Sequence, residues 1–135
     1  MLKIKLPARL EHLERLIEFV SEFLEYSGLT QKKIREIELA TEEALVNIFN
    51  YAYPEGAGDV KVSCRQDDDT RLVLEIADNG IPFDSLSLPD PDLAPDIPDR
   101  KIGGLGILLI RKMVDEVRYR RDGESNILTF IIHKR

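Results

Sequence analysis

The stretch that decides the fold is EALVN at residues 43–47, within a pattern that predicts a helix over about 31–52. Apolar residues recur in that pattern at helical spacing, and a segment rich in proline and glycine follows it. Glu43 and Asn47 are four residues apart, so their side chains project from neighbouring positions at the edge of the apolar stripe. A carboxylate and an amide therefore lie together on this helix.

The residue types of this pair suit the binding of a cation beside a reacting hydroxyl group. No basic residue stands four positions from Glu43, so the usual ion pair of a helix surface is unavailable there. An amide oxygen such as that of Asn47 can bind a hard cation such as magnesium. A carboxylate one turn away can orient or deprotonate a hydroxyl group or water. The alternative interpretation is an exposed polar edge of an ordinary helix.

Asp78 follows the alternating residues 72–76, which predict a strand, and it precedes Asn79 and Gly80. A carboxylate accepts hydrogen bonds only, so Asp78 can take the exocyclic amino group of adenine and reject guanine, which has a carbonyl there. Gly80 would let the main chain approach the base closely. Asp-Asn-Gly is also ordinary turn chemistry, and that interpretation remains open.

A third block, GGLG at residues 103–106, opens a helix expected over about 105–114. Glycine at a helix start exposes main-chain N–H groups, and the helix dipole there favours an anion. The candidate phosphate-binding residues of this block are Gly103, Gly104, Leu105 and Gly106. A sharp turn from loop to helix would need the same residues.

The stretch 79–104 has no periodicity and contains five of the seven prolines. A loop this long within a compact domain is either a functional lid, here about 81–103, or a disordered, solvated segment. Near its end, Arg100 and Lys101 are cations that can reach the terminal phosphates of a nucleotide when a lid closes.

The order of the expected elements predicts an α+β fold, a two-layer α/β sandwich. Its sheet is expected to be mixed and mostly antiparallel, with three main helices on one face. Strands are expected at about 2–6, 60–64, 72–76, 116–121 and 126–133, and helices at about 8–27, 31–52 and 105–114. The length predicts a single domain over residues 1–135.

Composition limits the class of protein. The chain has 43% apolar and 33% charged residues and a net charge of −6, which argues against direct nucleic-acid binding. No apolar run approaches the roughly 18 residues of a membrane span, and no signal peptide is recognisable. The single cysteine, Cys64, alternates with apolar residues and is expected to be a buried thiol. We therefore expect a cytoplasmic protein with no membrane partner.

Taken together, the three blocks and the lid between them resemble the Bergerat-fold (GHKL) ATPases, the superfamily that includes histidine-kinase ATPase domains. Within that superfamily the chain looks most like the bacterial anti-sigma factor serine/threonine protein kinases. The likeness is carried by TEEALVN at 41–47, NYAY at 50–53, DNGIPFD at 78–84 and the small size of the chain. It spans essentially the whole sequence.

The resemblance implies a Bergerat fold that binds Mg-ATP between the helices and an ATP lid. Residue matching would make Glu43 the catalytic base, Asn47 the magnesium ligand and Asp78 the selector of adenine. The glycines implied in the base pocket and along the phosphates are Gly80, Gly104 and Gly106. The chain departs from its relatives at Ile102, where some place an arginine, and Arg100 or Lys101 would substitute there.

The same resemblance implies an enzyme that uses ATP and Mg²⁺ to phosphorylate a serine or threonine of an anti-anti-sigma (STAS-type) partner. Family members bind a sigma factor in alternation with that partner, often as homodimers. The alternative is a non-catalytic ATP-binding module that holds its partner without phosphate transfer. A third interpretation, the ATPase half of a histidine kinase, would need a phosphoacceptor histidine, and His12 lacks the usual surrounding motif.

Overall fold

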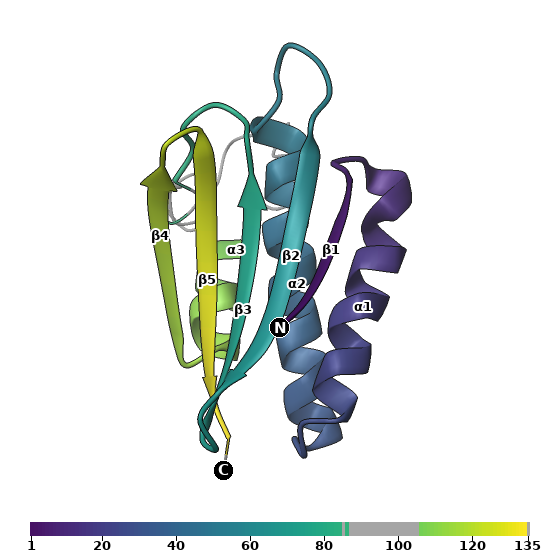
Figure 1. The fold of residues 1–135 in the computed structure, drawn as a ribbon, viewed down its shortest axis with the longest axis vertical. Coiled ribbons are helices and arrows are strands. Elements are labelled where there is room, and N and C mark those ends of the chain that lie inside the picture. Colours follow the sequence, from purple (N-terminus) through teal and green to yellow (C-terminus); the bar gives the residue numbers. More distant parts are fainter. Residues whose placement is uncertain (85, 87–105, 135) are drawn as a thin grey trace, which may run out of the picture.

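The computed structural model describes residues 1–84, 86 and 106–134 and contains one sheet with helices packed on one of its faces (Figure 1). The strands are β1 (Leu2–Pro7), β2 (Asp59–Asp67), β3 (Arg71–Asp78), β4 (Glu116–Asp122) and β5 (Ser125–His133). The helices are α1 (Leu13–Glu25), α2 (Gln31–Tyr51) and α3 (Gly106–Met113), with a 3-10 turn η1 (Leu10–His12) before α1. The expected order of elements is confirmed.

The five strands lie in the order β1-β2-β3-β5-β4, and each described pair is antiparallel. The two-layer α+β sandwich expected from the sequence is confirmed, with all three helices on the same face of the sheet (Figure 1). β3 and β5 are neighbours, and their register pairs Asp78 with Asn126 at the end of the sheet where β3 stops. Two polar residues therefore meet at this end.

Helix α2 is held in place by a cap at one end and by its apolar face along its length. Thr30 is the N-cap, and its side chain accepts a hydrogen bond from the main-chain N–H of Lys33 at 3.1 Å. The buried residues of this helix are Ile34, Ile37, Ala40, Thr41, Ala44, Leu45, Val46, Asn47 and Ile48. Because one of these residues is Asn47, α2 places a polar amide group in the layer between the helix and the sheet.

The core lies between the helices and the sheet. Its largest fully buried side chains come from both layers and include Leu16, Leu45, Leu74, Ile76, Ile110 and Phe130. Cys64 belongs to this core, and burial raises the pKa of its thiol to about 12. The expected buried thiol is confirmed. Among the described residues, no helix combines the length and the apolar character needed to cross a membrane.

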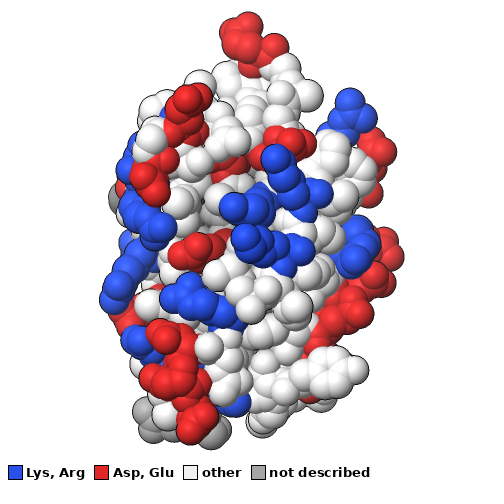
Figure 2. Space-filling model, in the orientation of Figure 1, with Lys and Arg blue, Asp and Glu red and all other residues white. Residues whose placement is uncertain are grey.

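The other face of the sheet carries charged side chains, as Figure 2 shows with basic groups spread over it. Lys3, Lys5 and Lys61 line a shallow hollow of about 410 Å³ on this face together with Glu75. One buried and one charged face is the usual arrangement of an antiparallel sheet in a two-layer sandwich.

The C-terminal end of α2 and the end of β3 meet through their main chains. The N–H of Ile81 donates to the carbonyl of Ala52 at 2.9 Å. A Cβ atom on Gly80 would lie 2.1 Å from that same carbonyl oxygen. Real Cβ contacts are never this short, so only glycine fits at position 80 without a shift of the main chain.

We predict that Gly80→Ala lowers the free energy of unfolding by about 1–3 kcal/mol, because the added methyl group must push α2 away from β3. Denaturant unfolding of the purified protein measures this change. Gly56→Ala is the matched control, since a Cβ there meets nothing within 4 Å, and we expect a change within about 0.5 kcal/mol. Equal midpoints for the two variants would contradict the prediction.

Candidate functional site

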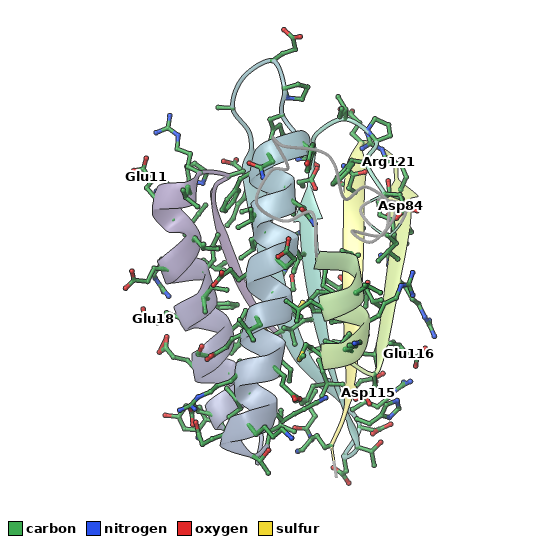
Figure 3. All side chains as sticks on the ribbon, turned by 180° about the vertical axis from the view of Figure 1, so that it is seen from behind. Glu11, Glu18, Asp84, Asp115, Glu116 and Arg121 are labelled. Atoms are coloured by element: carbon green, nitrogen blue, oxygen red, sulfur yellow. The ribbon has the colours of Figure 1, made fainter. Side chains whose placement is uncertain are left out.

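The candidate site lies where α2, the end of β3 and the start of β5 come together. Asn47 is fully buried and Asp78 is 5% exposed, while Glu43 is partly buried. Figure 3 shows Asp84 and Arg121 at this end of the molecule, opposite the end that holds Asp115. The structure thus brings Glu43 and Asn47 of α2 to the same end of the fold as Asp78 of β3.

The pair on α2 includes buried polar atoms without partners. Among the described residues, no group hydrogen-bonds to Oε2 of Glu43 or to either side-chain polar atom of Asn47. A buried polar group left without a partner costs about 1–3 kcal/mol, and native structures contain few of them. Because Asn47 is fully buried, an exposed polar edge is excluded at that position. Such atoms are expected where a ligand supplies the missing partner.

Burial raises the pKa of the Glu43 carboxyl group, and the neighbouring charge of Glu42 raises it further. The carboxylate is therefore a stronger base than an ordinary glutamate. A group of this kind, placed beside a reacting hydroxyl group, can accept its proton.

Asp78 is held by two hydrogen bonds to the same carboxylate oxygen. Oδ1 accepts from the main-chain N–H of Gly80 at 2.8 Å and from Nδ2 of Asn126 at 2.8 Å. The first of these is the hydrogen bond of an Asx-turn, so the turn interpretation of Asp-Asn-Gly is confirmed. Burial raises the pKa of Asp78, and the two hydrogen bonds and the positive charge of Arg121 oppose that rise.

Other residues at the site were not expected from the sequence, and the first of these is Asn126. It is 4% exposed and bonds to Asp78. Its position in β5 is in phase with the buried residues Leu128 and Phe130. A polar residue at a core position of an alternating strand is the signal that could have found it.

Two further side chains hold the turn after β3. Nη1 of Arg121 donates to the carbonyl of Gly80 at 2.8 Å. The hydroxyl group of Tyr53 accepts from the N–H of Asn79 at 2.8 Å and donates to the carbonyl of Asp59 at 2.5 Å. The main chain directly after Asp78 is thus held by Tyr53 at Asn79 and by Arg121 at Gly80.

The space beside Asp78 is small. A cavity of about 20 Å³ is lined by Ala44, Asn47, Ile48, Ile76, Asp78, Phe83, Tyr119, Asn126 and Leu128. This volume is about that of one water molecule. Phe83 borders the cavity, and its ring lies 5.1 Å from the ring of Tyr51. The aromatic pair therefore stands beside the position expected for a base.

The third sequence block is only partly within the described residues. Gly106 is the first residue of α3, where the glycine block was expected to open a helix. The other expected phosphate-binding residues lie outside the described residues, and these are Arg100, Lys101, Gly103, Gly104 and Leu105.

The donor set at the site fits magnesium only if the nucleotide supplies most of the ligands. In residues 1–84, 86 and 106–134, no group of three His, Cys, Asp or Glu side chains could hold a metal ion. The unpartnered amide oxygen of Asn47 is a suitable single ligand. Magnesium usually takes one or two protein ligands and completes its shell with phosphate oxygens and water. The residues present therefore fit a magnesium ion that arrives with phosphates.

Comparisons with known protein families place the fold and the site in context. The model of the histidine kinase-like ATPase domain matches residues 6–132 of this chain. The chain is 26% identical over 131 residues to serine-protein kinase RsbW of Bacillus cereus strain AH187, covering 94% of this chain and 81% of the relative. It is 27% identical over 131 residues to the protein of the same name from B. cereus strain G9842, with the same coverage.

A solved structure has the same fold. It contains the RsbU and RsbW domains of Rv1364c from Mycobacterium tuberculosis, and the TM-score is 0.63 at 14% sequence identity. The match covers 98% of this chain and 32% of the solved chain.

We predict that Asp78→Asn does not lower the free energy of unfolding at neutral pH. The amide keeps an oxygen for the N–H of Gly80 and removes a buried charge. Because the folded-state pKa of Asp78 is raised, its contribution to stability is lost as pH rises from the unfolded pKa through the folded one. The free energy of unfolding of Asp78→Asn should therefore increase relative to that of the wild type as pH rises through that acidic range. Urea unfolding at several pH values measures this difference.

Asp68→Asn is a control with the opposite sign. Hydrogen bonds from the main chain and hydroxyl group of Thr70 lower the pKa of Asp68. Its stabilising contribution is present above the unfolded pKa and is lost as pH falls through the folded pKa. The two variants should therefore change with pH in opposite directions, and parallel curves would contradict the assignment for Asp78.

Proposed function

The chain belongs to the family of histidine kinase-like ATPase domains, and on that premise we propose that it is an ATP-dependent serine/threonine protein kinase. It acts as an anti-sigma factor or a related partner-switching regulator, and its substrate is an anti-anti-sigma protein of the STAS type. The relatives named serine-protein kinase RsbW support this proposal, since they align over nearly the whole chain at 26–27% identity. A sigma factor and a second copy of the chain are further proposed partners.

The single observation that carries the proposal is the unpartnered polar pair on α2. Glu43 and Asn47 bring a carboxylate oxygen and an amide into the layer between helix and sheet with no partner among the described residues. A purely structural helix would lose nothing by having apolar residues there. A bound nucleotide with its metal ion would supply the partners that these atoms lack.

The nucleotide is proposed to be ATP. Asp78 would accept the exocyclic amino group of adenine, and Gly80 would let the main chain lie against the base. The ring of Phe83 would have to turn outward for this while its main-chain N–H stays bonded to Asn126, because a space of about 20 Å³ does not hold a purine. The proposed phosphate contacts are Arg100, Lys101, Gly103, Gly104, Leu105 and Gly106, on the sequence arguments given above.

Asn47 is the proposed magnesium ligand through its side-chain oxygen. When bound, magnesium would neutralise charge on the phosphate oxygens during transfer. Glu43 lies one helical turn before Asn47 and is proposed to accept the proton of the attacking serine or threonine hydroxyl group. Its raised pKa brings it closer to the pH at which a general base is most effective. Phosphoryl transfer otherwise depends on positioning more than on covalent chemistry.

We predict that Glu43→Gln lowers the turnover number for transfer of labelled phosphate from ATP to the partner by about 10²–10⁴-fold, the usual contribution of a general base. Nucleotide affinity should change little, because the side chain keeps its size. Glu42→Gln is the matched control: Glu42 is the adjacent residue and is exposed, so its variant should retain transfer near the wild-type rate at a pH above the acid limb of the rate profile, where Glu43 is ionised in both proteins. Undiminished transfer in Glu43→Gln would exclude Glu43 as the base.

The pH profile gives a second prediction from the same pair. Transfer should fall on acidification, since Glu43 must be deprotonated to act as a base. The charge of Glu42 raises the pKa of Glu43, so Glu42→Gln should lower that pKa and move the acid limb of the rate profile to lower pH. Rates measured from about pH 5 to 8 test this. An unmoved limb would show that another group controls the profile.

The same experiments separate the kinase from a non-catalytic module. Calorimetry that shows ATP binding, together with no phosphorylated product from any anti-anti-sigma candidate, would favour a module that holds its partner in a nucleotide-dependent conformation. Absence of ATP binding would overturn both.

A further inference from the structure

The side chain of Asn126 uses its whole hydrogen-bonding capacity. Nδ2 donates to Oδ1 of Asp78 at 2.8 Å and to the carbonyl of Ile81 at 2.7 Å. Oδ1 accepts from the hydroxyl group of Tyr119 at 2.6 Å and from the N–H of Phe83 at 3.1 Å. An asparagine amide has two N–H donors and two acceptor lone pairs, so none is left over.

The chemistry of these partners fixes the orientation of the amide. A carboxylate at neutral pH and a main-chain carbonyl are acceptors only, and the N–H of Phe83 is a donor only. Turning the amide of Asn126 by 180° would place oxygen against oxygen and N–H against N–H. The side chain is 4% exposed, so water cannot readily take over these bonds. Asn126 is therefore locked in one orientation.

The fixed orientation of Asn126 determines which carboxylate oxygen of Asp78 is available to a ligand. Both donors that reach this carboxylate within the described residues, the N–H of Gly80 and Nδ2 of Asn126, bind Oδ1. Oδ2 is thereby left to accept from a ligand. The hydrogen bond from Asn126 also opposes the rise in the pKa of Asp78 that burial causes, so it favours the ionised, acceptor-only form.

The same amide holds the chain that follows β3. Residues 81 and 83 are both bonded to Asn126, and Phe83 borders the small cavity beside Asp78. One side chain of β5 thus joins the carboxylate to the first residues after it.

We propose that Asn126 is a positioning residue of the base-binding site, which holds Asp78 with Oδ2 free for the amino group of an adenine nucleotide and ties residues 81–83 to that carboxylate. This inference rests on the proposed function, since it takes the nucleotide to be ATP. Asn126 acts through Asp78 and makes no contact with the base in this assignment.

The test is the affinity for ATP and for GTP, measured by calorimetry on the full chain from about pH 5 to 8. Loss of one hydrogen bond to a charged group corresponds to about a tenfold or larger effect. In Asn126→Ala we expect ATP to bind about tenfold more weakly at pH 7, and the ratio of ATP to GTP affinity to fall. The pH at which binding is half lost on acidification should rise, because Asp78 takes up its proton at higher pH without this donor.

Two further variants make the test decisive. Asn126→Asp keeps the volume and the acceptor toward Tyr119 but sets a second carboxyl group against Asp78, so the half-loss pH should also rise; this variant decides the matter if Asn126→Ala does not fold. Ser125→Ala is the control, since it removes a neighbouring hydrogen bond, to Asn79, and should leave both the affinity ratio and the half-loss pH unchanged.

The outcomes distinguish this inference from its premise. Wild-type protein that binds no ATP at any pH would overturn the proposed function and this inference with it. Wild-type protein that binds ATP, with folded Asn126 variants of unchanged affinity ratio and half-loss pH, would overturn this inference alone. A fall in unfolding stability without any shift in those two measurements would show that Asn126 has a structural role only.

Discussion

The main-chain contact between α2 and the turn after β3 is the constraint on which the candidate site depends. The carbonyl of Ala52 accepts a hydrogen bond from the N–H of Ile81. The absence of a side chain at Gly80 lets the end of α2 and the turn after β3 come this close. This contact sets how far the C-terminal half of α2 lies from the carboxylate of Asp78. The two ends of the proposed nucleotide site, one on a helix and one on a strand, are therefore held at a fixed separation by a main-chain contact, to which the hydrogen bond from the N–H of Asn79 to the hydroxyl group of Tyr53 adds.

Two buried asparagines show how differently the two ends are built. Asn126 has partners for each of its donors and acceptors, so its end of the site is rigid before any ligand arrives. Asn47 is equally buried, yet among the described residues its amide has no partner. The carboxylate at the proposed base-binding end is thus preorganised by the protein, whereas the amide at the proposed cation-binding end has no such support from the described residues.

Much of the fold could be predicted from the sequence because its signals are local. The spacing of apolar residues located α2, and the alternation in β2 and β3 located those strands, as the structure confirms. The site was harder. Glu43, Asn47 and Asp78 belong to short blocks with recognisable chemistry, but Asn126 lies 48 residues from its partner Asp78. Its role depends on the pairing of β3 with β5, which no local pattern specifies.

Binding of the proposed nucleotide and cation at the amide of Asn47 would link the stability of the folded protein to the supply of that ligand. A ligand that binds only the folded state adds to stability, by about 2.7 kcal/mol when present at a hundredfold excess over its dissociation constant. The amide of Asn47 offers such a ligand hydrogen bonds that the described residues do not supply. The resistance of the protein to proteolysis would therefore fall when the proposed nucleotide is scarce, even if its synthesis stayed constant.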